Sequence, residues 1–345
     1  MPGDLKKALE MHLVGAMLTS SIALGKKLGL FDALAEAGCK ERYVHEWLSC
    51  LACGDIIEIT PDEKFWMTDE AKHEFTGLNN FVVANMAFVP SVMQTFDDLA
   101  EAFKKDSGKY GLEYSQFDQF YEMMDKITQL MHSKHLVADY FPMIGMADKL
   151  ETGGLQVLDV GCGSGFHALT MAKQYPNCQV FGIDISEKAI SMAKESQKKK
   201  GLPNLEFHVM DAGNMNPDWT AKFDFVTIFD ACHDQMRPDL CLKEIYRMLK
   251  PNGVNGSSNA YIDKQFGGAF ACALYATSMF HCLPVGSNSP DALCMGAMWG
   301  EKRACDLLEK AGFDKENVKI IRPPFFPMNI VYVCRKQSNF PLASL

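Results

Sequence analysis

The N-terminal part of the chain repeats apolar residues first with the period of a helix and then with the period of a strand. Apolar residues recur at helical spacing over 13–34 and again over 42–53. Two short apolar stretches, 55–59 and 64–68, flank the turn sequence TPDE, which predicts a two-stranded wing. Helices followed by a hairpin give the outline of a winged-helix domain. Residues 80–150 continue in a helical pattern rich in Met and Phe, which indicates packing more than a substrate site.

From Leu155 onward the pattern changes to apolar strands that alternate with helices. The strands are predicted over 155–161, 179–186, 205–212 and 223–231. This alternation predicts an α/β fold in which helices cover both faces of a parallel sheet. The chain then ends in a helix, 300–313, and two strands that we expect to form an antiparallel hairpin, 317–324 and 329–336.

Composition narrows the classes of partner. Of 345 residues, 48% are hydrophobic and 22% are charged, which is enough apolar material for a full core. The formal net charge of −9 argues against a large nucleic-acid interface, because phosphate contacts need clustered Lys and Arg. The compact basic run Lys198–Lys200 is expected to end a solvated helix.

Cysteine usage and the N-terminal sequence bear on location. The 12 cysteines lack the spacing of a disulfide framework, which fits reduced thiols in the cytoplasm. Cys50 and Cys53 form a lone C-x-x-C, which without a second pair does not predict a metal site. No signal peptide is recognised, and no uninterrupted apolar run reaches 18 residues, so no membrane-spanning helix is expected.

The stretch VLDVGCGSGF joins a predicted strand to a glycine-rich turn. Gly161, Gly163 and Gly165 give a G-x-G-x-G spacing, whereas dinucleotide enzymes use G-x-G-x-x-G. Asp159, two residues before the first glycine, would repel a pyrophosphate but suits an ammonium group. The turn therefore favours a zwitterionic amino-acid adduct of adenosine such as S-adenosylmethionine. Ser164 has an elbow-like setting, but the glycine register fits a cofactor loop better.

Two further acids follow the next strands. Asp184 ends the second strand, where a carboxylate can accept both ribose hydroxyls, and Asp211 with Ala212 follows the third, where a carboxylate can accept from an adenine amine. An Asp after one strand is commonly a turn residue or a helix cap. Three acids after three successive strands, in register with the glycine turn, indicate a cofactor site.

The motifs VLDVGCGSG, GIDIS and DA resemble those of class I S-adenosylmethionine-dependent methyltransferases, over roughly residues 155–335. KERYVHEWLSCLACGDIIEI, FDACHDQMRP and CMGAMWGEKRACDLLEKAGF are similar to a subfamily with an N-terminal winged-helix domain, found in mycobacteria and invertebrates. The resemblance implies a Rossmann-like sheet, a homodimer formed through the winged-helix part, and cofactor contacts that include Cys162, Ile185 and Phe229. It also implies four segments: a winged-helix-like dimerisation domain (1–78), a helical linker or lid (79–150), the methyltransferase domain (151–337) and a tail (338–345).

His233 is the strongest candidate for a general base. It follows the fourth strand, at the carboxyl edge where ligands of such folds bind, and Asp234 or a backbone carbonyl could orient it. The competing interpretation is that His233 caps a helix or contacts the methionine part of the cofactor. The resemblance places His281, Cys282 and Trp299 around the acceptor pocket, although His281 also suits a core histidine and Trp299 a hydrophobic staple. Lower-ranked candidates are Tyr114, His132 and His135, and no metal-ligand spacing is convincing.

The chain departs from the family pattern in two places. After the helix that ends in KPNG, a fifth strand of apolar residues is expected, but Val254 alone of such a strand is recognisable before NGSSNAYIDK. Gly38 and Cys39 join two N-terminal helices where the family has another short helix. We interpret both gaps as marks of a splice form or gene-model truncation. Loss of the fifth strand would leave the edge of the fourth strand unpaired.

The leading functional hypothesis is S-adenosylmethionine-dependent methyl transfer to the oxygen or sulfur of a small-molecule acceptor, by a cytoplasmic homodimer without nucleic-acid or membrane partners. The alternative is a non-catalytic dimeric sensor of S-adenosylmethionine or S-adenosylhomocysteine, or a truncated inactive form. A transcription regulator is disfavoured by the acidic composition. The sequence does not name the acceptor.

Overall fold

The computed structural model describes residues 2–32, 38–76, 81–86, 88–260, 269–326 and 329–337. Its contacts divide the chain into two compact units. Unit 1 comprises Met1–Asp97 and Phe117–Ile127, and unit 2 comprises Asp98–Gln116 and Thr128–Leu345. The predicted tail, 338–345, lies outside the described residues.

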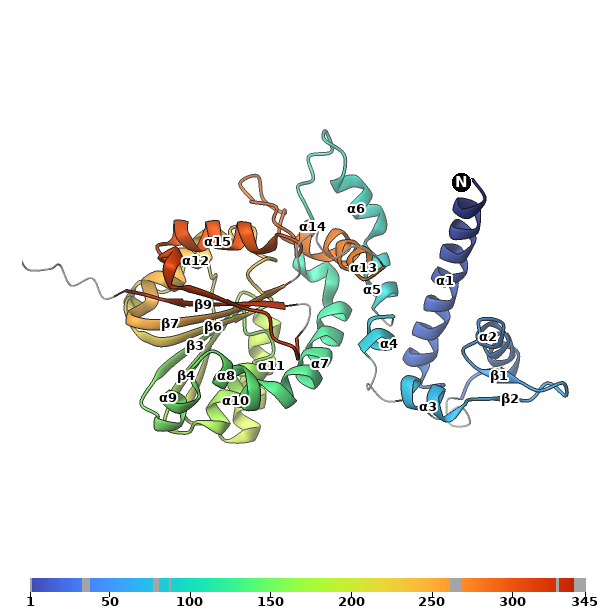
Figure 1. The fold of residues 1–345 in the computed structure, drawn as a ribbon, viewed down its shortest axis with the longest axis horizontal. Helices are drawn as coiled ribbons and strands as arrows, with labels where there is room; N and C mark the ends of the chain where they lie inside the picture. The colour runs from blue at the N-terminus through green and yellow to red at the C-terminus, as the bar shows by residue number, and fades with distance from the viewer. Residues whose placement is uncertain are drawn as a thin grey trace, which may run out of the picture. The chain divides into compact units, whose positions relative to one another are not determined.

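Unit 1 contains the predicted helices and wing. Helix α1 (Pro2–Leu28) is followed by α2 (Glu41–Cys53), the antiparallel pair β1 (Glu58–Ile59) and β2 (Phe65–Trp66), and α3 (Asp69–Phe75) (Figure 1). The Thr68 side chain caps α3 by accepting from the backbone N–H of Ala71 at 3.0 Å. This order of elements confirms the winged-helix outline.

Trp47 of α2 anchors the core of unit 1. Its indole N–H donates to the Ser21 carbonyl of α1 at 2.8 Å, and the ring meets Phe31 edge to face at 5.0 Å. Gly25 makes this approach possible, because a Cβ at that position would lie 2.4 Å from the Trp47 ring. The apolar face of α2 thus packs against α1.

The segment 80–150, which the sequence predicts to be mostly helical, consists mostly of helices. It contains α4 (Phe81–Met86), α5 (Val89–Met93), α6 (Phe96–Ala102), the short turn η2 (Tyr114–Phe117), α7 (Asp118–His135), the π-helical turn η3 (Leu136–Tyr140), α8 (Phe141–Met143) and α9 (Ala147–Thr152).

Unit 2 is built on a seven-stranded sheet with the order β5-β4-β3-β6-β7-β9-β8 (Figure 1). Five strands are parallel, and β9 runs antiparallel to both β7 and β8, which confirms the predicted terminal hairpin. The strands are β3 (Gln156–Val160), β4 (Gln179–Asp184), β5 (Leu205–Val209), β6 (Phe223–Phe229), β7 (Leu249–Ala260), β8 (Val318–Ile321) and β9 (Asn329–Arg335).

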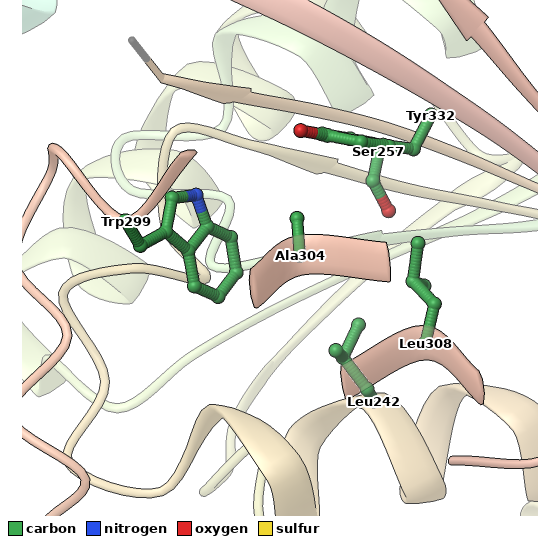
Figure 2. A pocket seen from close by; sticks show the side chains of 6 residues that line it. All are labelled: Leu242, Ser257, Trp299, Ala304, Leu308 and Tyr332. Carbon is green, nitrogen blue, oxygen red and sulfur yellow. The ribbon is translucent and has the colours of Figure 1, made fainter. Parts of the chain in front are cut away.

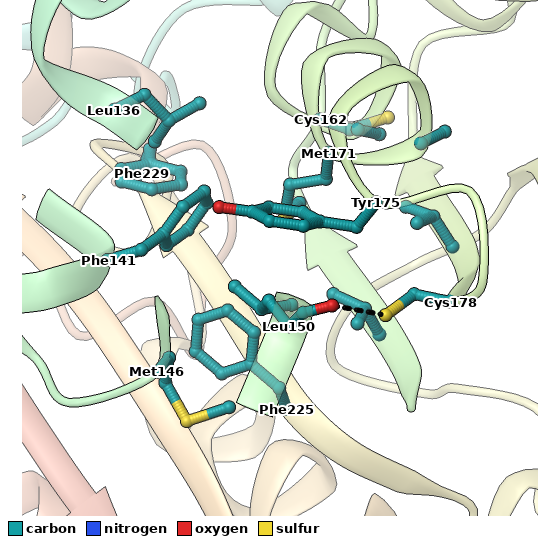
Figure 3. Close-up of a cluster of buried hydrophobic side chains, with 14 of the residues drawn as sticks. Leu136, Phe141, Met146, Leu150, Cys162, Met171, Tyr175, Cys178, Phe225 and Phe229 are labelled. Carbon is teal, nitrogen blue, oxygen red and sulfur yellow. Dashed lines mark hydrogen bonds between the residues drawn. The ribbon is translucent and has the colours of Figure 1, made fainter. Parts of the chain in front are cut away.

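Helices cover both faces of this sheet. On one face lie α8, α9, α10 (Phe166–Gln174) and α11 (Glu187–Lys200), and their core includes Phe141, Met171 and Phe225 (Figure 3). On the other face lie α12 (Pro238–Met248) and α15 (Gly300–Ala311). Lys198–Lys200 form the last turn of α11 as expected, with Gly201 in the left-handed conformation closing the helix. The remaining described helical segments are η4 (Pro217–Trp219), α13 (Ala269–Thr277), η5 (Ser278–Cys282), α14 (Leu283–Val285) and η6 (Lys315–Asn317).

The prediction that the fifth strand is missing was wrong. The polar sequence LKPNGVNGSSNA forms β7, which pairs with β6 from Val254 to Ser258 and with β9 from Val254 to Ala260. The edge of β6 is therefore satisfied, and the sheet is complete. The sheet therefore gives no sign of a truncation.

Small polar residues succeed in β7 because the backbone supplies the hydrogen bonds of a central strand whatever its side chains. Asn255 and Ser257 are both buried, and the Ser257 hydroxyl donates to Asn255 Oδ1 at 3.0 Å. Gly256 lets the neighbouring helix approach closely: a Cβ there would lie 3.1 Å from Ile144, and its carbonyl accepts from the Tyr140 hydroxyl at 3.3 Å. A search for an apolar run cannot find such a strand.

Two other expectations concern the junction between the first helices and the apolar character of α1. The shortened junction between the first helices includes residues 33–37, which lie outside the described residues. The expectation that no segment could span a membrane is not met, because Leu5–Leu28 of α1 is long and apolar enough by length and composition, with little of it buried. Signal sequences and core helices pass the same test, so this finding alone assigns no location.

The packing around β7 generates a stability prediction. Replacing Gly256 with Ala forces its new methyl against Ile144 and Phe225, and we expect the free energy of unfolding to fall by roughly 1–3 kcal/mol. Gly15→Ala in α1, where no atom lies within 4 Å of the added methyl, is the matched control and should be neutral or stabilising. Urea unfolding of both variants measures the difference, and equal effects would contradict the close packing at β7.

Candidate active site

The glycine turn links β3 to α10 and leaves one position open. Gly161, Gly163 and Gly165 all have positive φ, at 65°, 54° and 85°. A Cβ at Gly161 would meet Ala231 at 2.4 Å and one at Gly165 would meet Phe207 at 2.6 Å, whereas nothing lies within 4 Å of Gly163. The outer glycines are therefore required by packing as well as by backbone conformation, whereas a side chain at Gly163 would meet no neighbouring atom.

Asp159 is buried in β3 just before this turn, and it is only half satisfied. Its Oδ1 accepts from the Thr227 hydroxyl of β6 at 2.8 Å, while Oδ2 has no hydrogen-bond partner among the described residues. Burial raises the pKa of Asp159 to about 7, with a further contribution from the nearby Asp184 carboxylate. An oxygen of this kind suits a cationic hydrogen-bond donor from a ligand.

Asp184 at the end of β4 holds the glycine turn in place. Its two oxygens accept from the backbone N–H groups of Gly163 at 2.8 Å and Ser186 at 2.9 Å. Burial raises the pKa of Asp184, and the backbone hydrogen bonds oppose that rise. Each carboxylate oxygen keeps a further lone pair for a ligand hydroxyl. Ile185 beside it is 61% exposed, which offers an apolar surface at the same strand end.

The third acid is more open. Asp211 follows β5, is exposed, and uses Oδ1 to accept from the Gly213 N–H at 2.8 Å. Ala212 is half-buried and packs against the core on the α12 side of the sheet. The ends of β3, β4 and β5 meet at one sheet edge, so the three acids share an edge as the sequence predicted.

Two of the predicted cofactor residues use their side chains elsewhere. The Phe229 ring stacks on His167 with centroids 4.1 Å apart and belongs to the core shown in Figure 3. Cys162 is buried in the same core. Their predicted contact with the cofactor stays a prediction.

His233 and Asp234 follow β6 at the same edge of the sheet. Nε2 of His233 lies 3.2 Å from Asp234 Oδ1, with the histidine side chain 3% exposed and the aspartate side chain 18% exposed. The two groups are therefore close together in a nearly enclosed position, and the orienting role of Asp234 stays a prediction.

The segment around η5 adds two more buried groups. His281 and Cys282 are 1% and 5% exposed. Burial lowers the pKa of His281 to about 4, so its ring is neutral at physiological pH, and it is close enough to Asp234 and His233 to interact with both electrostatically. Burial also raises the pKa of the Cys282 thiol. The structure thus brings His281 to the His233 region, as predicted.

Trp299 is part of the core on the α12 side of the sheet. It is the residue before α15 and packs into the core between α12, α15 and the sheet, where it borders a small cavity (Figure 2). None of the other lining residues belongs to the predicted site: Leu242, Ser257, Ala304, Leu308 and Tyr332. Within the part of the chain that is described, this placement favours the packing interpretation of Trp299 over the substrate pocket.

Of the lower-ranked candidates, His132 and His135 contact other side chains, whereas Tyr114 is partly exposed. His132 Nδ1 lies 2.8 Å from His167 Nε2 and its ring stacks on Phe326, while burial lowers the pKa of His132 to about 4. His135 Nδ1 lies 2.7 Å from Asp139 Oδ2. Tyr114 lies in the short turn η2 and is 39% exposed. In unit 1, the Cys50 sulfur lies 3.4 Å from the Ser21 hydroxyl.

Sequence comparison identifies both parts of the chain. The profile of a methyltransferase domain family matches residues 151–281, and that of the Rv2258c-like winged HTH domain matches 16–76. Residues 151–281 are a methyltransferase domain. The chain thus combines a winged-helix domain with a methyltransferase domain, which confirms the resemblance inferred from the motifs.

Individual relatives agree with this assignment. The chain is 29% identical over 121 residues to a ubiquinone biosynthesis O-methyltransferase of Pseudomonas fluorescens, a match that covers 33% of this chain and 51% of the relative. It therefore spans about half the length of that relative. In structure it is similar to mitomycin 7-O-methyltransferase (TM-score 0.73, 18% identity, 97% and 98% of the two chains) and to human N-acetylserotonin methyltransferase in complex with SAM (0.64, 16%, 97% and 98%). These two likenesses show a shared fold.

The sequence did not single out two residues of the site. Thr227 lies in the middle of the apolar strand β6, and its pairing with Asp159 depends on the sheet order. Asp230 has a positive φ of 49° just after β6 and accepts from Asn329 Nδ2 at 2.9 and 3.0 Å. The position of Asp230, three residues before His233, was a weak signal for its role. No local signal marked Thr227.

The buried carboxyl group of the methyltransferase domain generates a pH-dependent prediction. The folded-state pKa of Asp159, about 7, lies above its unfolded value of 3.8, so the folded chain holds this proton more tightly and loses stability as pH rises between these values. Asp159→Asn removes this penalty. Its stability gain at pH 8 should exceed its gain at pH 5 by about 2–3 kcal/mol.

Denaturant unfolding at the two pH values measures this gain. Asp148→Asn, an exposed aspartate on α9, is the control and should show no such dependence. A gain for Asp159→Asn that is the same at both pH values would mean that Asp159 is ionised in the fold at pH 5.

Proposed function

We propose that the protein transfers the methyl group of S-adenosylmethionine to an oxygen or sulfur of a small-molecule acceptor. The observation that carries the proposal is the unpartnered Oδ2 of buried Asp159, an acid that lies four residues before Gly163 of the glycine turn. An ammonium group bound there would supply the missing hydrogen bond and the opposite charge together. The Gly163 turn would receive the amino-acid part of the same molecule.

The remaining cofactor contacts follow from the order of the strand ends. We assign the ribose hydroxyls to the free lone pairs of Asp184, the adenine face to exposed Ile185, and the adenine amine to Asp211. Asp211 keeps its second oxygen for this purpose, since Oδ1 serves the turn. Ala212 would lie beside the base.

His233 is assigned as the general base for the acceptor. Methyl transfer is an in-line displacement at a sulfonium carbon, so the enzyme mainly aligns the acceptor and excludes water. An O–H or S–H acceptor also gives up a proton, which the His233 ring would take while Asp234 holds the ring and stabilises its charged form. Asp230, whose carboxylate also interacts electrostatically with His233, would add to that stabilisation.

The second candidate is a non-catalytic sensor of S-adenosylmethionine or S-adenosylhomocysteine. It keeps the cofactor contacts but gives His233 no reaction to assist. The complete sheet removes one ground for it, because β7 is present and paired. The winged-helix domain remains a ground in its favour.

Substitution of the base separates the two functions. His233→Ala should lower methyl transfer by about 10²–10⁴-fold while S-adenosylmethionine binding stays within a few-fold. Turnover is measured as S-adenosylhomocysteine formation with a panel of phenols and thiols, and binding by calorimetry. His73→Ala, an exposed histidine on α3, is the control. Cofactor binding without turnover on any acceptor in the wild-type chain would support the sensor.

We further propose a homodimer formed through the winged-helix domain (1–78), with 79–150 as linker or lid and 151–337 as the catalytic part. Leu5, Leu9, Leu13 and Met17 recur every four residues along α1, and each is at least 60% exposed. Such a stripe fits a second copy of the same helix. The 12 cysteines, all free, support a cytoplasmic location, and the net charge of −9 supports a small-molecule acceptor instead of nucleic acid.

The α1 stripe gives a direct test of dimerisation. Leu13→Glu places a charge in the stripe and should shift the protein from dimer to monomer in sedimentation velocity, with at least a tenfold weaker association. Lys7→Glu, an exposed charge change on the same helix, should leave the dimer intact. A monomeric wild-type chain, or one that floats with lipid vesicles through α1, would contradict the dimer.

A further inference from the structure

Three different metal-ligand types converge beside the proposed base. The ligand atoms of His233, Asp234 and Cys282 all lie within 4.8 Å of one another. Nε2 of His233 lies 3.2 Å from Asp234 Oδ1. The resemblance placed Cys282 near the acceptor pocket, but the spacing along the chain did not predict a metal-ligand set, because Cys282 lies far from the other two residues.

The backbone holds the two contributing segments tightly together. His233 and Asp234 follow β6, whereas Cys282 ends the π-helical turn η5, an element frequently found at functional sites. A Cβ at Gly286 would meet the carbonyls of Cys282, Asp234 and His233 at 3.1–3.4 Å. Glycine thus allows these segments to pack backbone against backbone, which fixes the distances among the three side chains.

The charges of the cluster match those of a divalent cation. A neutral imidazole, a carboxylate and a thiolate together carry −2, so a bound M²⁺ leaves the site neutral. Neutrality matters here because the His233 and Asp234 side chains are only 3% and 18% exposed and Cys282 is buried. The partial exposure of Asp234 also provides a route of entry.

We propose that His233, Asp234 and Cys282 form a binding site for one thiophilic divalent cation, of which Zn²⁺ is the reference. Nitrogen, sulfur and oxygen ligands together are typical of zinc, and a thiolate disfavours Mg²⁺ and Ca²⁺. Binding replaces the thiol proton of Cys282 by a metal–sulfur bond and releases the proton to solvent. Three protein ligands leave the fourth tetrahedral position open.

A bound cation and the proton of the acceptor would compete for the lone pair on Nε2 of His233. A cation on Nε2 of His233 prevents that nitrogen from taking a proton, so the cation-bound chain would be inactive in base-assisted methyl transfer. The cation site itself rests on the spacing of the three ligand atoms and stands whether or not the chain transfers methyl groups. Its test is therefore a measurement of metal binding.

Cobalt(II) reports directly on thiolate ligation in the full chain. After treatment with a chelator, the wild-type protein titrated with Co²⁺ should develop a thiolate-to-cobalt charge-transfer band that saturates at one cobalt per chain. The visible bands should be those of tetrahedral cobalt, and added Zn²⁺ should abolish both sets.

Variants assign the ligands. Cys282→Ser should lose the charge-transfer band, and Asp234→Asn, which keeps the shape of the side chain, should weaken cobalt binding at least tenfold while keeping the band. Cys272→Ser, an exposed cysteine on α13, is the matched control and should behave as wild type. Circular dichroism checks folding. No band in the wild-type chain, or a band that survives Cys282→Ser or disappears in Cys272→Ser, would overturn the site.

Discussion

The site depends on a carboxyl group that the fold buries without fully satisfying. Asp159 receives one hydrogen bond, from Thr227, and its other oxygen has no partner among the described residues. Burial of an acid in this state disfavours its charged form, which is why its pKa rises to about 7. A cationic ligand reverses that penalty, so the same feature that weakens the free protein strengthens binding. The unpartnered oxygen of Asp159 thus lowers the stability of the free protein and raises its affinity for a cationic ligand.

The parts around Asp159 depend on the sheet order. Thr227 reaches Asp159 because β3 and β6 are neighbours, and Asp184 reaches the Gly163 N–H because β4 lies on the other side. On the far side of β6, β7 completes the sheet and β9 brings Asn329 to Asp230. His233 and Asp234 are then carried to the same edge by β6. A cofactor at the glycine turn and a base after β6 are thus consequences of one strand arrangement.

The sequence predicted the parts of this fold that local chemistry determines. Glycines at positions of positive φ, acids after apolar strands and the alternation of strands with helices all have a local signature, and the structure has them where they were expected. β7 was missed because a central strand can be held by its backbone while Asn255, Gly256 and Ser257 supply only small side chains. The side-chain environments of Trp299 and Cys282 could not be predicted in detail, because both depend on how distant segments pack.

The most direct test of the central claim is calorimetric binding of S-adenosylmethionine to the wild-type chain and to Asp159→Asn at pH 7.5. We expect micromolar binding by the wild-type chain and at least tenfold weaker binding by the variant. The side-chain amide introduced by Asp159→Asn cannot neutralise the ammonium group of the ligand. Both proteins must be folded under these conditions, as judged by circular dichroism. Equal affinity in the two proteins, or no binding by the wild-type chain, would contradict the role assigned to the unpartnered oxygen of Asp159.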